Sequence, residues 1–246
     1  MTRRVLITGS SAGIGAAAAA AFASAGWSVV GVDRIEGASE DLEQFVELDL
    51  AKTGAIDTIA QVVDGLDRLD AVVNNAALQI NSSLLATSDE DWDSTMAVNV
   101  RIAFQIIRAT APLLAKTRGA VVNVSSVHAV ATSENVAAYA ISKGALAALT
   151  RSAALELGPS GVRCNAVLPG AVDTEMLRAG MGRRAHPDGA AGNMRKLAGA
   201  TPLRFIATPQ QLAPTILHLA DGEQSPYTTG QLLVVDGGAS LRLGTE

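Results

Sequence analysis

Short apolar runs alternate with longer amphipathic stretches along the chain. Apolar runs without polar alternation are typical of strands covered on both faces. Seven runs rich in Val, Ile and Leu predict strands at Arg4–Thr8, Ser28–Val32, Gln44–Leu48, Ala71–Asn74, Ala120–Ser125, Arg163–Leu168 and Gln231–Val235. The helical stretches between them repeat a β-α-β unit, which predicts an α/β fold with a right-handed, doubly wound parallel sheet.

Two helical stretches are long and have recognisable ends. Ser88–Ala115 contains one, with Ser88 as its expected N-cap and three acids directly after it, where a helix dipole favours negative charge. Asn135–Leu157 contains the other, and Gly158 and Pro159 end it. The least regular stretch covers about residues 173–202. No polar linker interrupts the pattern, so we expect one domain over residues 1–246.

Composition narrows the classes of function. With 48% apolar and 17% charged residues, the chain can form a large buried core. A net charge of −5 without a basic block argues against nucleic acid as a partner. The lone Cys164 excludes an internal disulfide and is best interpreted as a small buried hydrophobe. Three scattered histidines form no metal-ligand pattern, so we expect no metal.

The uncharged run Val5–Val32, preceded by two arginines, resembles a signal peptide or membrane span at first sight. Glycine and hydroxyl residues interrupt it, and its centre is weakly hydrophobic alanine. A buried strand–turn–helix–strand unit explains the missing charges better. We therefore expect a cytoplasmic protein that does not act at a membrane.

A glycine-rich turn follows the first predicted strand. Gly9, Gly13 and Gly15 precede an unbroken alanine run. A strand, a glycine turn and a helix N-terminus together can hold a pyrophosphate with backbone N–H groups. The spacing G-x-x-x-G-x-G departs from the G-x-G-x-x-G dinucleotide pattern, so on its own an ordinary turn is an equally good interpretation.

Tyr139 and Lys143 lie four residues apart in an alanine-rich helical stretch, and Ser126 lies thirteen residues before Tyr139. Residues at i and i+4 share one helix face, so we expect the lysine to lower the pKa of the tyrosine below about 10. Such a phenol can exchange a proton with an alcohol while a serine hydroxyl holds the substrate oxygen. This trio predicts alcohol–carbonyl redox chemistry, provided that a cofactor carries the hydride.

The run Thr8–Gly15, combined with Tyr139 and Lys143, resembles the short-chain dehydrogenase/reductase family. The likeness covers essentially the whole chain, and the one departure is Ala77 in place of the usual glycine. Four further motifs follow that family's order and intervals: Asn74-Asn75-Ala76-Ala77, Asn123-Val124-Ser125-Ser126, the run from Asn165 to Gly170, and Asp236-Gly237-Gly238.

The resemblance implies a Rossmann fold, NAD as cofactor and four catalytic residues. Ser126 would orient the substrate oxygen, Tyr139 would act as acid and base, and Lys143 would tune the tyrosine and hold the nicotinamide ribose. Asn99 would bend its helix and join a water relay to the lysine.

The resemblance also implies a set of cofactor-binding residues. Asp49 would bond the adenine, or cap the next helix. Asn75 and Ala76 would flank a ribose, or Asn75 would close the strand as part of a structural pair. Thr174 would bond the nicotinamide amide, or cap a helix. The whole set is Gly9, Ser11, Gly13, Ile14, Gly15, Asp33, Asp49, Leu50, Asn75, Ala76, Tyr139, Lys143, Pro169, Gly170, Val172 and Thr174.

Asp33 decides which dinucleotide we expect. It ends the second predicted strand, eighteen residues after Gly15, where an acid accepts hydrogen bonds from the adenosine ribose. A carboxylate there repels the extra phosphate of NADP, whereas the adjacent Arg34 could pair with that phosphate. No basic residue lies within the glycine turn, so NAD is favoured.

Gln79 and His128 are the expected substrate contacts beside Ser126 and Tyr139, although both could be ordinary surface residues. Similar residues occur in 3-hydroxybutyrate and sugar dehydrogenases, but Val136 and Ala171 depart from the hydroxybutyrate pattern. By position, residues 173–202 resemble the family's substrate loop, which here carries Arg178, Arg183, Arg184, His186, Arg195 and Lys196. Those cations either attract an anion or simply solvate the loop.

With only eight aromatic residues in the chain, we expect a small polar substrate: a sugar, a polyol or a hydroxy acid. The alternatives are a 3-ketoacyl-thioester reductase, which would prefer NADPH, and a non-catalytic NAD-binding regulator, which should have lost part of the catalytic set. By resemblance we expect a homotetramer that pairs through its two long helices and the C-terminal segment.

Overall fold

The computed structural model describes residues 2–37, 41–183 and 185–241. Seven strands form one parallel sheet in the order β3-β2-β1-β4-β5-β6-β7. All seven predicted strands are confirmed, with ends shifted by no more than one residue. They are β1 Arg4–Thr8, β2 Ser28–Asp33, β3 Gln44–Glu47, β4 Ala71–Asn74, β5 Ala120–Val124, β6 Arg163–Pro169 and β7 Leu232–Val235.

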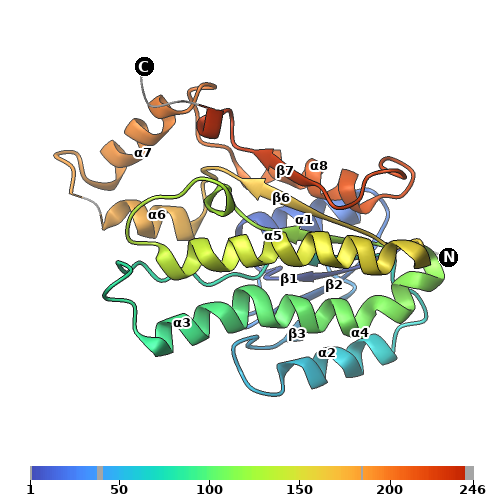
Figure 1. The fold of residues 1–246 in the computed structure, drawn as a ribbon. Helices are drawn as coiled ribbons and strands as arrows, with labels where there is room; N and C mark the ends of the chain where they lie inside the picture. Colours follow the sequence, from blue (N-terminus) through green and yellow to red (C-terminus); the bar gives the residue numbers. More distant parts are fainter. Residues whose placement is uncertain (1, 38–40, 184, 242–246) are drawn as a thin grey trace.

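Helices cover both faces of the sheet, which confirms the doubly wound Rossmann arrangement (Figure 1). One apolar cluster packs α2, α4 and α5 against one face, and a second packs α1 and α8 against the other. The helices are α1 Gly13–Ser24, α2 Ala55–Asp64, α3 Asp89–Met96, α4 Ile102–Thr117, α5 Ala137–Leu157, α6 Glu175–Gly182, α7 Gly189–Ala200 and α8 Pro209–Ala220. Among the described residues, none of these helices is long and apolar enough to cross a bilayer.

The order of the strands predicts where a ligand binds. The chain runs from β1 outward to β2 and β3, then returns to place β4 on the other side of β1. In open α/β sheets, ligands bind at the carboxyl ends of the strands on either side of such a reversal. The glycine turn follows β1 and Asn75 follows β4, so both lie at this point.

The structure refines the long helix predicted within Ser88–Ala115. Ser88 caps α3 as expected, by accepting a hydrogen bond from the backbone of Asp91 at 3.1 Å. Between α3 and α4, however, Ala97–Arg101 forms a π-helical turn that contains Asn99. Such turns insert one extra residue and bend the axis locally.

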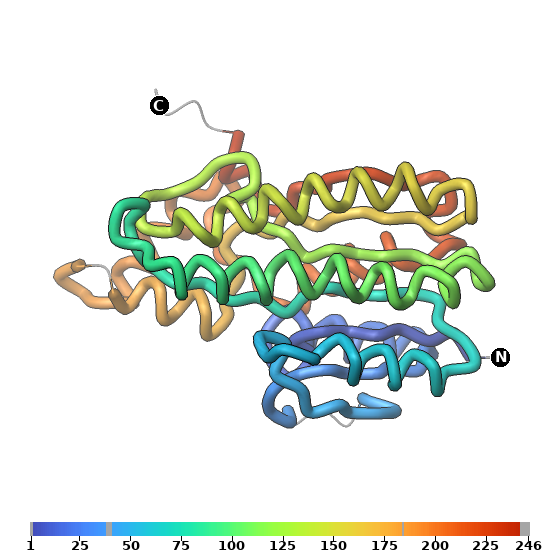
Figure 2. The backbone as a smooth tube through the Cα atoms, turned by 60° about the horizontal axis from the view of Figure 1, so that its bottom comes forward, coloured from blue at the N-terminus to red at the C-terminus, as the bar shows by residue number. Residues whose placement is uncertain are grey.

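The expectation of an irregular stretch over residues 173–202 is wrong. This stretch forms α6 and α7, which lie together beyond the carboxyl ends of the strands, at the left of Figures 1 and 2. A buried amide links them, because Asn193 Nδ2 donates to the carbonyl of Met181 at 3.0 Å. The many glycines hid a helical pair that tertiary packing stabilises.

Candidate active site

The turn after β1 requires its glycines. Gly9 has φ of +67° and Gly13 of +55°, a backbone region that side chains rarely adopt. A Cβ atom on Gly15 would lie 1.9 Å from the carbonyl oxygen of Gly9 and 2.5 Å from Asn75 Nδ2. The turn therefore packs backbone directly against backbone, and these glycines are not those of an ordinary solvent-exposed turn.

The N-terminus of α1 is suited to an anion. Its N-cap, Ala12, supplies no side-chain hydrogen bond, and the first turn contains no acid. By contrast, α3 has a serine cap and three acids in its first turn. The first N–H groups of α1 therefore need an acceptor from outside the helix. A diphosphate of a dinucleotide fits this cradle of glycines and helix N–H groups.

Asp33 lies at the end of β2, beside the glycine turn. Its carboxylate accepts hydrogen bonds from the backbone N–H of Ser11 at 3.0 Å and of Arg34 at 2.7 Å. The hydroxyl of Ser11 donates to the carbonyl of Ile35 at 2.6 Å. The carboxylate is thus held at the position where the ribose of a dinucleotide is expected.

Asn75 closes the strand, which was one of the two expected roles. Its Nδ2 donates to the carbonyls of Thr8 and Gly9, both at 3.0 Å. The backbone N–H groups of Asn75 and Ala76 both donate to Thr8 Oγ1 at 3.1 Å. Asp49 caps no helix, because its side chain accepts from the backbone of Ala51 at 3.0 Å instead.

The loop after β6 reaches back to the glycine turn. Thr174 acts as the N-cap of α6: its hydroxyl accepts from the backbone of Leu177 at 3.3 Å. Its methyl carbon lies 3.2 Å from where a Cβ atom of Gly13 would be. The N-cap role is therefore observed, in a position that borders the cradle. Gly170 packs against Asp236, and Val172 is buried, as is Leu50 after β3, whereas Ile14 is half-buried.

Ser126 and Tyr139 form the expected contact. Both are buried, and a side-chain hydrogen bond joins the serine hydroxyl to the tyrosine. The expectation of a lowered tyrosine pKa is wrong here, because burial raises the pKa of Tyr139 to about 12 and the bond from Ser126 opposes this only in part.

The position of Lys143 explains why the pKa of Tyr139 is not lowered. Its Nζ donates to the carbonyl of Val124 at 2.8 Å and lies 5.5 Å from the centre of the Tyr139 ring. The side chain is 1% exposed, and this burial lowers the pKa of the ammonium to about 8. The lysine is thus held at the catalytic turn, but by the end of β5 and not by the phenol.

Both the oxygen and the nitrogen of the Asn99 side-chain amide form hydrogen bonds. Its Oδ1 accepts from the backbone N–H of Leu78 at 2.7 Å, while Nδ2 donates to the carbonyl of Leu78 at 2.9 Å and to Ser142 Oγ at 2.9 Å. At 2% exposure, this satisfied amide joins the π-helical turn to the segment after β4 and to α5. The regular α-helix is interrupted at Asn99, as expected, by a π-helical turn.

His128 lies beside the tyrosine. The two rings pack edge to face with their centres 5.8 Å apart, and the ring Nδ1 is 3.0 Å from Thr132 Oγ1. Gln79 follows Leu78 directly and donates to Asn81 Oδ1 at 3.0 Å. Of these two side chains, His128 is the one that contacts the ring of Tyr139.

Two arginines of the segment 173–202 are already paired. Arg178 makes a two-pronged hydrogen bond to Asp173, at 2.7 and 2.9 Å, and Arg195 pairs with Asp188. Arg184 lies outside the described residues. These pairs weaken the expectation that the segment attracts an anionic substrate.

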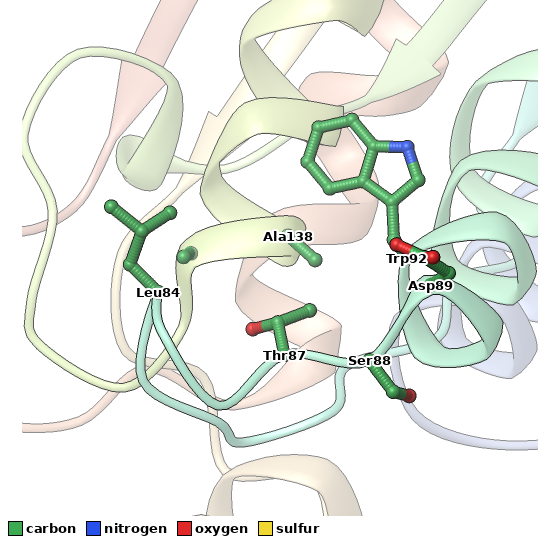
Figure 3. A pocket seen from close by; sticks show the side chains of 7 residues that line it. Leu84, Thr87, Ser88, Asp89, Trp92 and Ala138 are labelled. Carbon is green, nitrogen blue, oxygen red and sulfur yellow. The ribbon is translucent and has the colours of Figure 1, made fainter.

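A small cavity lies next to the catalytic helix but does not contain the catalytic side chains. It has a volume of about 110 Å³ and forms where the segment from Leu84 to Ser88 meets the starts of α3 and α5. Figure 3 shows Trp92, Thr87 and Ala138 around it. Neither Ser126 nor Tyr139 lines it, so we assign it no catalytic part.

Two buried serines were missed from the sequence. Ser125 donates to the carbonyl of Lys143 at 2.9 Å, and Ser142 donates to the carbonyl of Tyr139 at 2.7 Å. The signal for Ser142 was its place between Tyr139 and Lys143 in a helix that is otherwise alanine-rich. Ser125 was noted only as the neighbour of Ser126.

Comparison with known proteins identifies the family. The family described as enoyl-(acyl carrier protein) reductase matches residues 9–240. A Xenopus laevis protein named dehydrogenase/reductase SDR family member 6 is 34% identical over 244 residues, which cover 96% of this chain and 97% of that protein. The chain belongs to the short-chain dehydrogenase/reductase family. It is an oxidoreductase with the fold of that family.

Two further dehydrogenases are similar to this chain over nearly its whole length. The 2,3-dihydro-2,3-dihydroxybenzoate dehydrogenase of Escherichia coli strain K12 is 37% identical over 242 residues, 97% of each chain. The ligand-free aldohexose dehydrogenase of Thermoplasma acidophilum superposes with a TM-score of 0.93 at 28% identity, covering 100% of this chain and 96% of that one.

Structures of the family have been solved with either nicotinamide dinucleotide. A 4-hydroxyisoleucine dehydrogenase complexed with NADH has a TM-score of 0.83 and ElxO with NADP one of 0.86. Each of the two structures is 26% identical to this chain, and each alignment covers 98% of this chain and all of the other. The cofactor of the short-chain dehydrogenase described here is therefore a nicotinamide dinucleotide.

Proposed function

We propose that the protein is an NAD-dependent dehydrogenase that interconverts a secondary alcohol and a ketone on a small polar substrate. The observation that carries the proposal is the buried contact between Ser126 and Tyr139, one helical turn from Lys143. This contact lies at the same edge of the sheet as the glycine cradle, since β1 and β5 are parallel. Cofactor and proton donor can therefore meet one substrate.

The chain's own residues hold the substrate oxygen and move the proton. When bound, the dinucleotide supplies the hydride acceptor or donor. The Ser126 hydroxyl holds the substrate oxygen beside the phenol of Tyr139. Because its pKa is about 12, the phenol is protonated at neutral pH and can donate a proton to a ketone oxygen. In the oxidising direction the phenolate form of Tyr139 accepts the proton of the alcohol, so oxidation should speed up as the pH rises toward the pKa of the phenol.

Asp33 supports NAD over NADP. Its carboxylate beside Ser11 would repel a phosphate on the adenosine ribose. We expect NAD to be favoured about tenfold or more in kcat/KM, since one unfavourable charge contact contributes about 1 kcal/mol. Asp33→Ala should reduce the preference for NAD over NADP. The control is Asp57→Ala, which replaces an exposed acid on α2 and should leave the preference unchanged. Steady-state kinetics with both cofactors decide the matter, and a wild-type preference for NADP would refute the proposal.

Polar contacts near the phenol support a polyhydroxylated substrate. His128 packs on Tyr139, and Gln79 follows the segment held by Asn99. Two relatives have names that describe hydroxylated substrates for those proteins: a 2,3-dihydro-2,3-dihydroxybenzoate dehydrogenase, whose substrate also carries a carboxylate, and an aldohexose dehydrogenase. The paired arginines Arg178 and Arg195 make neutral sugars and polyols better candidates than hydroxy acids.

A substrate panel tests this choice. We expect sugars or polyols to be oxidised faster than hydroxy acids, hydrophobic cyclic alcohols and steroids. His128→Ala should lower kcat/KM on the best polyol about tenfold, as loss of a polar substrate contact does. His218→Ala, a control on α8, should change nothing. If apolar alcohols are the better substrates and His128→Ala has no effect, the proposed substrate class is wrong.

The same panel separates the alternatives. A 3-ketoacyl thioester with NADPH tests the reductase alternative, which the carboxylate of Asp33 opposes. A regulator without activity would turn over nothing, yet this chain keeps Asn99, Ser126, Tyr139 and Lys143. The complete set supports an enzyme.

We propose a homotetramer that acts in the cytoplasm. Exposed apolar side chains on α4 and α5 support pairing through these helices: Phe104 is 47% exposed and Leu155 is 79% exposed. The edge strand β7 also exposes Leu233 and Val234. Light scattering at micromolar concentration should give the mass of four chains, and a monomer would contradict the proposal.

A further inference from the structure

Two buried hydroxyl groups of α5 have the same bonding pattern. Ser142 Oγ donates to the carbonyl of Tyr139 at 2.7 Å and accepts from Asn99 Nδ2 at 2.9 Å. Thr150 Oγ1 donates to the carbonyl of Leu146 at 2.8 Å and accepts from Asn123 Nδ2 at 2.9 Å. Both side chains are fully buried. Each therefore joins α5 to an asparagine elsewhere in the fold.

The two hydroxyls differ in what they join. Ser142 directly precedes Lys143, and its partner Asn99 holds both backbone groups of Leu78, beside Gln79. The partner of Thr150 is Asn123, which accepts from Asn74 Nδ2 at 2.8 Å within the sheet. Ser142 thus connects the catalytic turn to the segment expected to meet substrate. Thr150 connects the far part of the same helix to the sheet.

The presence of a serine at position 142 needs a reason. Serine is a poorer helix former than alanine, because its hydroxyl competes for backbone hydrogen bonds. Several other buried positions of α5 are alanine, among them Ala138, Ala147 and Ala154. Alanine would remove the acceptor of one Asn99 N–H in a dry environment, which is costly. The hydroxyl therefore serves the amide of Asn99, not the packing of the helix.

We propose that Ser142 is a positioning residue: its hydroxyl fixes the catalytic turn of α5 to Asn99, so that Tyr139 meets a substrate held by the segment of Leu78. The inference rests on the proposed function. Reacting groups must be held within a fraction of an ångström, so a small rotation of α5 is sufficient to slow proton transfer. The glycine cradle is built from other segments, the turn after β1 and the start of α1, and this bond does not involve them.

Kinetics of Ser142→Ala and of the matched variant Thr150→Val test the proposal on the full-length protein. We expect Ser142→Ala to lower kcat about tenfold while KM for NAD stays within about twofold, since a positioning defect affects the chemical step. Thr150→Val should keep kcat within about twofold. Its melting temperature should nevertheless fall about as much as that of Ser142→Ala. Equal losses of kcat in both variants, or none in either, would overturn the proposal.

A second measurement needs no turnover. In a Tyr227→Phe background Tyr139 is the single tyrosine, so phenolate absorbance after rapid pH jumps reports its ionisation alone. Ser142→Ala should admit water and lower the titration midpoint of Tyr139 by about half a unit or more, and Thr150→Val should not. Identical midpoints in both variants would refute the positioning role. If the wild type oxidises no alcohol, the proposed function fails separately, and this titration still decides the role of Ser142.

Discussion

The two ends of α5 use the same polar chemistry for different purposes. Near its start, the helix carries a tyrosine, a serine and a lysine that are all buried, and Asn99 approaches them from a π-helical turn. Further along, Thr150 meets Asn123 on a regular strand. Both asparagines satisfy a buried hydroxyl. Only at the first end does the backbone around the asparagine depart from a regular helix or strand.

The difference shows where the fold accepts a cost for function. A lysine inside the protein loses its hydration, and the lowered pKa of Lys143 records that loss. At the far end the described hydrogen-bond partners of the Asn123 amide are the uncharged Asn74, Thr150 and Cys164, so we expect this cluster only to stabilise the fold. The central claim is that burial at the catalytic end, and not the charge of Lys143, sets the proton affinity of Tyr139 in the free protein.

The largest expected effect comes from removing the phenol. Tyr139→Phe should lower kcat at least about a hundredfold, a typical loss when an acid–base group is removed. NAD should still bind, which fluorescence titration can measure. Tyr227→Phe is the control, because that exposed side chain lies far along the chain after α8. Near-wild-type turnover of Tyr139→Phe would end the mechanism.

Replacing Asn99 or Asn123 should have the next largest effect, on kcat for the first and on stability for the second. Asn99→Leu should lower kcat about tenfold or more, since the segment of Leu78 loses two hydrogen bonds that position it and Ser142 loses a third. Asn123→Leu should keep kcat within about twofold but lower the free energy of unfolding by about 1–2 kcal/mol, because Asn74 and Thr150 lose a partner. Urea unfolding and steady-state rates on both variants measure this. A larger loss of kcat in Asn123→Leu would contradict the comparison.

The smallest expected effect is on stability. Lys143→Met should raise the free energy of unfolding at pH 7 by on the order of 1 kcal/mol, since a buried charge is replaced while one hydrogen bond is lost. The folded pKa of Lys143 is lowered to about 8, from 10.5, so wild-type stability rises with pH between these values. The advantage of the variant should therefore shrink over that window.

Unfolding curves at pH 7 and pH 10 measure how much more stable Lys143→Met is than the wild type. Lys52→Met is the control, because Lys52 is exposed and its replacement should give no pH-dependent difference. An advantage of Lys143→Met that grows with pH would mean that the lysine is not held as a costly buried cation.

The strands and the positions of the candidate catalytic residues could be predicted because their signals are local. A continuous Val-rich run such as Ala120–Ser125 has few alternatives to a buried strand, and the four-residue offset of Tyr139 and Lys143 follows from helix geometry. The glycine turn was ambiguous alone. Its meaning became clear only with contacts between distant segments, such as Asn75 against Gly9 and Gly15.

The features that sequence reasoning missed depend on tertiary environment. The pKa of Tyr139 was expected to fall because of Lys143, yet the lysine bonds the carbonyl of Val124, and the pattern of residues contains no information on that choice. The two helices of residues 173–202 were hidden by glycines that weaken local helix signals. The role of Ser142 required a partner 43 residues away.

The titration of Tyr139 in the folded Tyr227→Phe protein tests the central claim most directly. Phenolate absorbance, recorded after rapid pH jumps and before alkaline unfolding, should show a midpoint near pH 12, well above the ordinary value of about 10 for tyrosine. Lys143→Met in the same background should leave the midpoint close to that value. A midpoint below about 10 that rises when Lys143 is replaced would contradict the account, because the lysine charge would then control the phenol.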